Sequence, residues 1–354
     1  MAPRARPIGH WAACGAALAA SACLGPADYP GVNSSQPLGD LGGASSRADD
    51  GTAQDEASTT ASSGSSTTEN PIPSRKDTAA DSGGDTSGGE TPLLLAVVGD
   101  YGTDTDKSAE VGALVASLNP DHVFTLGDNN YPIGAAATID DHIGQYYSAF
   151  IANYQGSYGN GAAQNRFWPA PGNHDWGTPN LTPYVEYFTL PGNERYYEID
   201  LGLVHLFAVD SDIHEPDGYT AGSLQAAWLK HALLQSTACW KLVYFHHPAY
   251  SSAQHGSDED LQWPFEAWGA DAVLAGHDHT YERLAVGGIP YFVNGLGGAS
   301  TYSFHTPLPE SVVRYNAEYG AMTIAATSTE LAFEFINVDG ERIDFHTVDK
   351  DCAR

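Results

Sequence analysis

The stretch that decides the fold runs from Leu93 to Asp100 and reads LLLAVVGD. Its six apolar residues end in the β-branched Val97 and Val98, and a glycine and a carboxylate follow at once. A short, uninterrupted apolar run of this kind predicts a buried strand. Because open α/β sheets carry their functional groups at the carboxyl ends of their strands, we expect Asp100 to belong to a site.

The same arrangement recurs at four further places along the chain. Apolar runs lead into or form part of Gly127-Asp128-Asn129-Asn130-Tyr131, Gly172-Asn173-His174-Asp175, Val243-Tyr244-Phe245-His246 and Gly276-His277-Asp278-His279. A single Gly-Asp is a common turn, and a single histidine is usually a core or surface residue. Five hydrophobic runs that each deliver Asp, Asn, Tyr or His instead predict a metal site at the edge of the sheet.

The rest of the chain predicts an α/β protein. Apolar runs predict strands at residues 93–98, 122–126, 240–245 and 271–275, and helical spacing predicts helices at residues 107–118 and 221–235. The second helix has Leu224, Ala227, Trp228 and Ala232 on one face. Antiparallel strands are predicted at residues 289–293, 321–326, 331–337 and 342–348, with Asp339-Gly340 as a hairpin turn. We therefore expect two mixed sheets covered by helices.

The donor types in the five motifs narrow the choice of metal. Carboxylates and a tyrosine phenolate are hard oxygen donors, suited to a trivalent ion such as iron(III). Imidazoles and an asparagine carbonyl suit a divalent ion such as zinc, iron(II) or manganese. A carboxylate shared by both ions would hold them roughly 3.5–4 Å apart, the separation found in two-metal hydrolases.

The five motifs, in this order, resemble those of the calcineurin-like metallophosphoesterases and, within them, the purple acid phosphatases, which include the tartrate-resistant acid phosphatases. That family carries GD, GDxxY, GNH(D/E), VxxH and GHxH, and all five stand between residues 92 and 354. The resemblance implies a four-layer α/β/β/α sandwich, the metallophosphoesterase fold. It also implies an acid phosphatase in which metal-bound hydroxide attacks the phosphorus of a small phosphomonoester.

The resemblance further implies a role for each motif residue. Asp100, Tyr131 and His279 would bind iron(III), Asp128 would bridge, and Asn173, His246 and His277 would bind the divalent iron, zinc or manganese. His174 would lie beside the substrate, and His255, nine residues after His246, beside the leaving group. Asp175 would either orient His174 or act as a structural turn acid.

One difference from the wider superfamily favours the purple acid phosphatases. Many phosphodiesterases of the superfamily begin with Asp-x-His, but here Gly102 stands two residues after Asp100. Tyr131 would supply the missing donor; the alternative is that it is a packed aromatic residue. Two other functions stay open: a metallophosphodiesterase acting on cyclic nucleotides or lipid headgroups, and a non-catalytic surface lipoprotein that binds phosphate or metal.

The charge of the chain argues against nucleic acid as a partner. The 354 residues carry 44 acidic and 15 basic side chains, a formal net charge of −29, although only 17% of residues are charged. The chain therefore lacks the basic stripe that nucleic acid requires, and an anionic membrane surface would repel it. The two metal ions with their ligands would nevertheless leave a small local positive charge, to which a phosphomonoester can bind.

The first ninety residues predict export. Arg4 and Arg6 precede an apolar run that is too short to span a bilayer, so residues 1–25 predict a signal peptide. Ala20-Ser21-Ala22-Cys23 is similar to a bacterial lipobox, which would lipidate Cys23; an ordinary cleaved signal is the alternative. Residues 26–91 predict a disordered acidic linker rich in Ser, Thr and Gly. The catalytic domain would be residues 92–354, held at the cell surface or in the periplasm as a lipoprotein, or secreted.

Several other residues carry narrower expectations. Export predicts a disulfide between Cys239 and Cys352. Strand alternation predicts that His247 points away from the ligand His246. We expect His205, His231 and His214 to be packing or surface residues; the alternative for His214 is that it reaches the mouth of the site. Trp168, Trp176 and Trp263 would either line the cleft or pack in the core.

Overall fold

A computed structural model describes residues 90–352 of the chain. The predicted signal peptide, its Cys23 and all but the last two residues of the predicted linker lie outside the described part. The described residues belong to one compact unit. Between residues 90 and 352, no helix is both long and apolar enough to cross a membrane.

Thirteen strands and five α-helices form within residues 90–352. The strands are β1 (Leu93–Val98), β2 (His122–Leu126), β3 (Phe167–Ala170), β4 (Tyr197–Asp200), β5 (Val204–Ala208), β6 (Trp240–Tyr244), β7 (Ala272–Ala275), β8 (Tyr281–Val286), β9 (Ile289–Asn294), β10 (Ser311–Tyr315), β11 (Gly320–Ala326), β12 (Glu330–Asn337) and β13 (Arg342–Asp349). The α-helices are α1 (Asp106–Leu118), α2 (Gln145–Tyr147), α3 (Thr182–Tyr187), α4 (Leu224–Gln235) and α5 (Phe265–Trp268).

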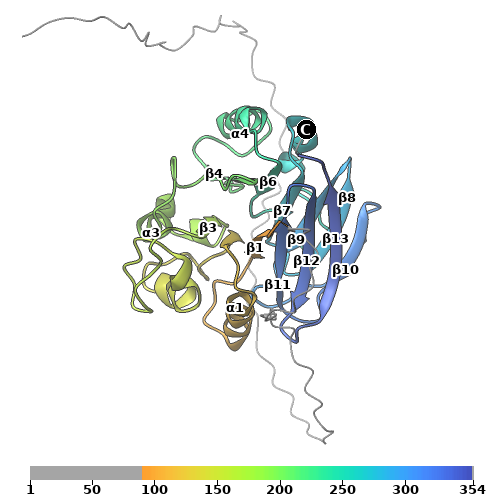
Figure 1. Ribbon diagram of the computed structural model, residues 1–354. Helices are drawn as coiled ribbons and strands as arrows, with labels where there is room; N and C mark the ends of the chain where they lie inside the picture. The colour runs from red at the N-terminus through yellow and green to blue at the C-terminus, as the bar shows by residue number, and fades with distance from the viewer. Residues whose placement is uncertain (1–89, 353–354) are drawn as a thin grey trace, which may run out of the picture. The chain divides into compact units, whose positions relative to one another are not determined.

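The strands form two mixed sheets (Figure 1). The six-stranded sheet has the order β13-β12-β11-β1-β2-β3, with β1, β2 and β3 parallel and β11 to β13 antiparallel. The seven-stranded sheet has the order β10-β8-β9-β7-β6-β5-β4, and its β5, β6, β7 and β9 are parallel. The antiparallel pairing predicted for the C-terminal strands is confirmed for β11, β12 and β13, including the β12–β13 hairpin. The predicted strand at residues 289–293 is present as β9, but it pairs antiparallel only with β8 and parallel with β7.

The alternation of side chains along β5 and β6 builds the layers. Leu206 and Leu242 pack into the hydrophobic core that the two sheets share. Their neighbours Phe207 and Val243 point the other way, into a second core with α4 and α5. Helix α1 contacts β11 of the six-stranded sheet, so helices cover both sheets. The predicted α/β/β/α sandwich is therefore confirmed.

Helix α4 ends at Gln235 as predicted, but it begins at Leu224 rather than at residue 221, and its buried face differs from the expected one. The Ser223 hydroxyl caps the helix by accepting a hydrogen bond from the Ala226 amide. Leu224, expected in the core, is 70% exposed, whereas Gln225 and Leu229 are fully buried. Apolar residues stand on nearly every side of this helix, so spacing alone does not define the face that packs against the sheet.

Tertiary contacts explain β8 and β10, two of the strands that the sequence pattern did not predict. Strand β8 contains Glu282 and Arg283, and these two charged residues interrupt the apolar pattern by which a strand is predicted from sequence. In the structure Arg283 forms an ion pair of 2.7 Å with Asp344 of β13, and Glu282 accepts hydrogen bonds from Ser252. Strand β10 pairs with β8. The predicted disulfide between Cys239 and Cys352 is present, with 5.5 Å between its Cα atoms.

Candidate metal centre

The five motifs meet where parallel strands of both sheets end. Asp100, Asp128 and Asn173 follow β1, β2 and β3 of one sheet. His246 and the pair His277 and His279 follow β6 and β7 of the other sheet. The carboxyl ends of parallel strands point the same way, so the packing of the two sheets brings these side chains together. The distances below show that they are in contact.

Asp100, Tyr131 and His279 form the first donor group. The Tyr131 hydroxyl lies 3.3 Å from Oδ1 of Asp100 and 3.1 Å from Nε2 of His279. Nε2 of His279 lies 3.4 Å from the same Asp100 oxygen. Nδ1 of His279 hydrogen-bonds the Ser300 carbonyl, so Nε2 is the nitrogen that can bind an ion. One carboxylate, one phenol and one imidazole therefore converge on a single point.

Burial raises the pKa of the Tyr131 hydroxyl well above its usual value, and the charges of Asp128 and Asp100 raise that pKa further. A phenolate would form here only beside a strong positive charge. A hard trivalent cation meets this requirement, because it can bind the phenolate and the carboxylate together. The residues of the first donor group therefore fit iron(III).

Asp128, Asn173, His246 and His277 form the second donor group. Nε2 of His246 lies 2.9 Å from Oδ1 of Asn173, 3.3 Å from Oδ2 of Asp128 and 3.2 Å from Nδ1 of His277. Nδ1 of His246 donates to the Leu126 carbonyl at 2.8 Å, which leaves Nε2 for an ion. Two imidazoles, an amide oxygen and a carboxylate are a donor set that a divalent ion prefers.

The pKa values of His246 and Asp128 also favour a cation in the second donor group. Burial lowers the pKa of His246, but the neighbouring Asp128 carboxylate outweighs burial and raises the pKa to about 10. Burial alone would raise the pKa of Asp128, yet His246 and the other histidines hold it well below its usual value. The Asp128 carboxylate thus favours a positive charge beside it, and a bound divalent ion can supply that charge.

Asp128 connects the two donor groups. Its carboxylate lies within 4.8 Å of the ligand atoms of Asp100 and His246, and these three buried side chains form a candidate cluster for a metal ion. The charge of Asp128 also acts on the first donor group, where it raises the pKa of the Tyr131 hydroxyl. A bridging carboxylate must face both ions, and Asp128 lies between the two groups of donors.

Strained backbone and glycines make room for these donors. Asp100, Asp128 and His277 have φ values of 57°, 50° and 68°, in the left-handed region that non-glycine residues rarely adopt. A Cβ atom at Gly172 would lie 2.3 Å from Oδ1 of Asp128, and one at Gly276 would lie 2.6 Å from Oδ2 of Asp100. Both glycines are therefore needed for the backbone to pass so close to the carboxylates.

His174 lies at the edge of the cluster. Its Nε2 is 3.9 Å from Oδ2 of Asp128, and its Nδ1 is 2.6 Å from the carbonyl oxygen of Pro132. Its ring packs on Tyr131 at 4.3 Å, and its side chain remains 36% exposed. A half-exposed imidazole next to, but not within, the donor groups can contact a bound substrate, as predicted for His174.

Asp175 does not orient the His174 ring. Its buried Oδ2 accepts hydrogen bonds from the Gly172 amide, at 2.8 Å, and from the side chain and amide of Asn129, at 2.8 and 3.1 Å. Burial, followed by the charge of Asp128, raises the pKa of Asp175 to about 7. Of the two predicted roles, the contacts support the structural one, because Asp175 ties two of the motif loops together.

His255 approaches the centre from a separate loop. Its exposed ring lies 4.2 Å from the ring of His277 and 5.3 Å from that of Tyr302. Its amide donates to Oδ1 of Asp278 at 2.8 Å. Sequence reasoning missed Asp278, although this residue occupies the variable position of the GHxH motif, and its burial is the feature that reveals it.

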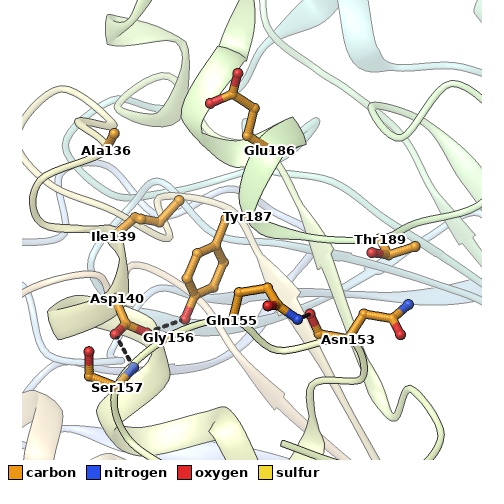
Figure 2. Close-up of a pocket in the computed structure, with 10 residues that line it drawn as sticks. All are labelled: Ala136, Ile139, Asp140, Asn153, Gln155, Gly156, Ser157, Glu186, Tyr187 and Thr189. Carbon is orange, nitrogen blue, oxygen red and sulfur yellow. Dashed lines mark hydrogen bonds between the residues drawn. The ribbon is translucent and has the colours of Figure 1, made fainter.

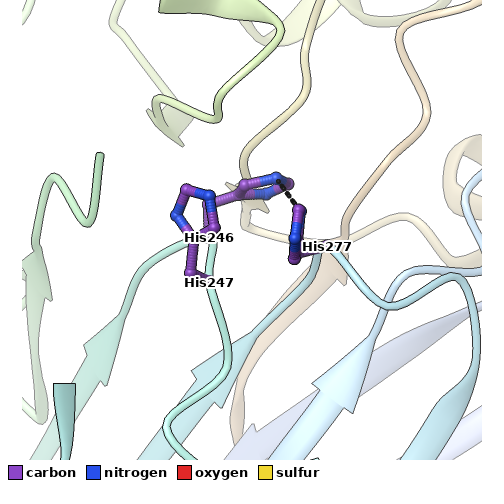
Figure 3. A group of neighbouring side chains, drawn as sticks. All are labelled: His246, His247 and His277. Carbon is purple, nitrogen blue, oxygen red and sulfur yellow. Dashed lines mark hydrogen bonds between the residues drawn. The ribbon is translucent and has the colours of Figure 1, made fainter. Parts of the chain in front are cut away.

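The prediction that His247 points away from the ligands is wrong. Its ring lies 4.9 Å from that of His246 and 4.5 Å from that of His277, and Figure 3 shows the three imidazoles together. The Ser211 hydroxyl fixes the ring through Nδ1 at 3.0 Å. Strand alternation does not apply here because β6 ends at Tyr244, two residues before His246.

The remaining candidate residues lie around or away from the centre. The ring of the exposed His214 stacks on Trp176 at 6.0 Å, which places it beside the segment that carries His174. His205 and His231 line a separate cavity of about 380 Å³ between β4 and α4. Trp263 is a core residue, and the Trp168 indole donates to His122.

A cavity of about 630 Å³ also lies outside the metal centre (Figure 2). Its lining includes Asp140, Glu186 and Tyr187, and none of the candidate metal ligands belongs to it. The Asp140 carboxylate there accepts hydrogen bonds from Tyr154, Tyr187 and the Ser157 amide at 2.6, 2.9 and 2.7 Å. These contacts stabilise the loops around the cavity.

The fold and the convergent donors define a two-sheet protein with a candidate binuclear metal site. Comparison with known proteins agrees, since a family model for calcineurin-like phosphoesterases matches residues 89–281. The chain belongs to this calcineurin-like phosphoesterase family. The predicted membership of the calcineurin-like metallophosphoesterases is thereby confirmed, with phosphoester hydrolase as the enzyme class, and the family implies a binuclear metal centre.

Curated relatives are acid phosphatases. The chain is 24% identical over 284 residues to purple acid phosphatase 4 of Arabidopsis thaliana, covering 71% of this chain and 82% of the relative. It is also 24% identical over 302 residues to tartrate-resistant acid phosphatase type 5 of Oryctolagus cuniculus, covering 72% of this chain and 90% of the relative.

Solved structures share the fold. A purple acid phosphatase from yellow lupin (Lupinus luteus) seeds superposes with a TM-score of 0.60 and 20% identity, covering 75% of this chain. The chain spans 55% of the lupin protein. GAP50 of Plasmodium superposes with a TM-score of 0.59 and 15% identity, covering 73% of this chain and 89% of that protein.

Proposed function

We propose that this phosphoesterase is an exported acid phosphatase that hydrolyses small phosphomonoesters with iron(III) and a divalent ion. The observation that carries the proposal is the position of the Tyr131 hydroxyl, within 3.3 Å of both Asp100 and His279. A tyrosine in this donor group favours iron(III) over the two divalent ions that a purely histidine and carboxylate centre would take.

Gly102 supports the same conclusion. A Cβ atom at this position would lie 2.1 Å from the backbone carbon of Asn129. The Gly102 amide donates to the Asp128 carbonyl, and the Tyr131 amide donates to the Gly102 carbonyl. The first and second motifs are therefore packed backbone to backbone at Gly102, where the Asp-x-His enzymes carry a histidine. The third donor must come from elsewhere, and Tyr131 is in place.

The residues of the centre suggest a division of roles. When bound, the two metal ions lower the pKa of coordinated water and neutralise charge on the phosphoryl oxygens. Asp100, Tyr131 and His279 would hold the trivalent ion, Asn173, His246 and His277 the divalent ion, and Asp128 both. His174, beside Tyr131, and His255, beside His277, would donate hydrogen bonds to the phosphoryl and leaving-group oxygens.

Location and partners follow from the sequence and form part of the proposal. A signal peptide and a lipidated Cys23 would place the enzyme at the cell surface or in the periplasm, and an uncleaved tether would hold it there. With a formal charge of −29, we expect a small phosphomonoester rather than nucleic acid as the substrate. Replacing Cys23 with serine should release the protein from the membrane fraction while leaving its specific activity unchanged.

The decisive experiment combines metal analysis, a visible spectrum and two substrates. The purified protein should contain about one iron and one divalent ion and should show a tyrosinate-to-iron(III) charge-transfer band. It should hydrolyse p-nitrophenyl phosphate in preference to bis(p-nitrophenyl) phosphate. A colourless, active protein with only zinc or manganese would refute the iron assignment. A preference for the diester would favour a phosphodiesterase, and full metal occupancy without hydrolysis would favour a binding protein.

A further inference from the structure

The loop that carries His255 is attached to the metal centre through one buried carboxylate. Oδ1 of Asp278 accepts a hydrogen bond from the His255 amide at 2.8 Å. Its Oδ2 accepts from the Ser251 hydroxyl at 2.5 Å and from the Gly256 amide at 3.2 Å. Asp278 itself is fully buried. Both of its oxygens are therefore used to hold the loop.

The position of the His255 ring depends on this attachment. Among residues 90–352 the ring makes only aromatic contacts, to His277 and Tyr302, and no hydrogen bond. An exposed imidazole held only by such contacts would sample several rotamers. The backbone at residues 255 and 256, which Asp278 fixes, therefore sets where the imidazole can reach.

Asp278 also links this loop to the ligands. It stands between His277 and His279 in the chain, so one short segment carries a ligand of each donor group and the anchor for the loop. A second buried carboxylate, Glu282, holds the same loop at Ser252, whose amide and hydroxyl donate to it at 2.8 and 2.6 Å. The geometry of His255 is thus tied to the metal ligands by charge-assisted hydrogen bonds.

We propose that Asp278 is a positioning residue, which holds His255 where its imidazole can hydrogen-bond the leaving-group oxygen. This inference rests on the proposed phosphomonoesterase function. A hydrogen bond at that oxygen matters most when the leaving group is a poor one, since an alkoxide carries more charge in the transition state than a nitrophenolate. Asp278 would therefore determine how well the enzyme hydrolyses alkyl phosphates.

The test uses Asp278→Asn, which keeps the shape of the side chain but removes one of the two acceptor oxygens. We expect kcat on an alkyl phosphate such as glycerol 2-phosphate to fall by about 10-fold or more, and kcat on p-nitrophenyl phosphate by less than about 3-fold. Metal content should equal that of the wild type. Asp140→Asn is the matched control, because Asp140 also accepts three hydrogen bonds but lies away from the donor groups.

A double-mutant cycle separates positioning from a general structural role. If Asp278 acts through His255, then Asp278→Asn should cause no further loss of alkyl phosphate turnover in a His255→Ala background. Equal losses on both substrates, loss of metal, or a full additional loss in that background would overturn the proposal. Should Asp278→Asn fail to fold, Ser251→Ala removes a single donor and should cause a weaker loss with the same leaving-group dependence.

Hydrogen exchange provides a readout that does not need turnover. The amides of residues 255 and 256 should lose protection in Asp278→Asn and keep it in Asp140→Asn. Unchanged protection in Asp278→Asn would refute the role of Asp278. A metal-loaded wild type that hydrolyses no phosphomonoester would refute the proposed function instead, so the two failures are distinguishable.

Discussion

The hydroxyl oxygen of Tyr131 lies 3.1 Å from Nε2 of His279, although 148 residues separate the two in the chain. Tyr131 follows a strand of the six-stranded sheet, and His279 follows a strand of the seven-stranded sheet. Their contact therefore depends on how the two sheets pack. It also joins a phenol to an imidazole beside a buried carboxylate, which makes Tyr131 the most informative residue to change.

Replacing Tyr131 with phenylalanine should abolish the visible charge-transfer band, because the phenolate that donates the electron is gone. Iron content should fall as well, since one of the four proposed donors, Asp100, Asp128, Tyr131 and His279, is lost. Absorption spectra and elemental analysis measure both effects. Tyr158→Phe is the control, because the Tyr158 hydroxyl also donates a hydrogen bond to a carboxylate, that of Asp141, but this bond is exposed and involves none of the candidate metal ligands. An unchanged band in Tyr131→Phe would show that Tyr131 is only a packed aromatic residue.

Replacing His174 with alanine should lower kcat for p-nitrophenyl phosphate by about 100-fold or more, the usual effect of losing a positioned acid or base group. Its Nε2 is 3.9 Å from Asp128, so it lies outside the donor groups and metal content should not change. Steady-state kinetics and elemental analysis test this, with His231→Ala on the exposed side of α4 as control. Near-normal turnover would mean that His174 does not touch the substrate.

Replacing Gly102 with alanine should destabilise the protein by more than about 2 kcal/mol, the range expected for forcing atoms into a packed site. The new Cβ would lie 2.1 Å from the Asn129 backbone, which cannot move aside as a flexible side chain would. Gly222→Ala is a matched control, because a Cβ there meets nothing within 4 Å. Urea unfolding measures both variants, and similar midpoints would contradict the tight packing of the two motifs.

The ion pair between Arg283 and Asp344 should make stability depend on pH in acid. Burial alone would raise the pKa of Asp344, but hydrogen bonds from Arg283 and Tyr281 lower it below its usual value. A carboxyl with a lowered pKa in the folded state stabilises the protein above its unfolded pKa of about 3.9. That contribution is lost as the pH falls through the folded pKa.

Replacing Asp344 with asparagine should therefore lower the free energy of unfolding near pH 7 by about 1–3 kcal/mol. The loss should shrink as the pH falls below about 4, where the wild-type carboxyl also becomes protonated. Unfolding curves at several pH values test this. Arg342→Met, in a pair whose arginine side chain is 61% exposed, should change stability little. A loss that stays constant with pH would contradict the ion-pair explanation.

Local pattern predicted the two longest helices, many of the strands and the candidate donors, but not strands such as β8 and β10. The runs before Asp100, Asp128 and His246 are mostly apolar, which favours buried strands, and the polar residues directly after these runs predicted the site. Thr105 and Ser223 cap the two main helices within one turn, which is a purely local effect. These features depend on residues that are close in the chain, so they can be predicted from the sequence.

The packing of the two sheets decided the rest. The alternation of side chains along a strand predicted that His247 points away from the ligands. Strand β6 ends at Tyr244, however, and the His247 ring packs against the His277 ring. Asp175 is an acidic residue in a candidate catalytic motif, but its carboxylate accepts hydrogen bonds from Asn129 and Gly172 and so has a structural role. The sequence by itself determined which residues can be ligands and on which strand ends they stand. Only the tertiary structure decided which of them lie within hydrogen-bonding distance of one another, because those contacts join residues far apart in the chain.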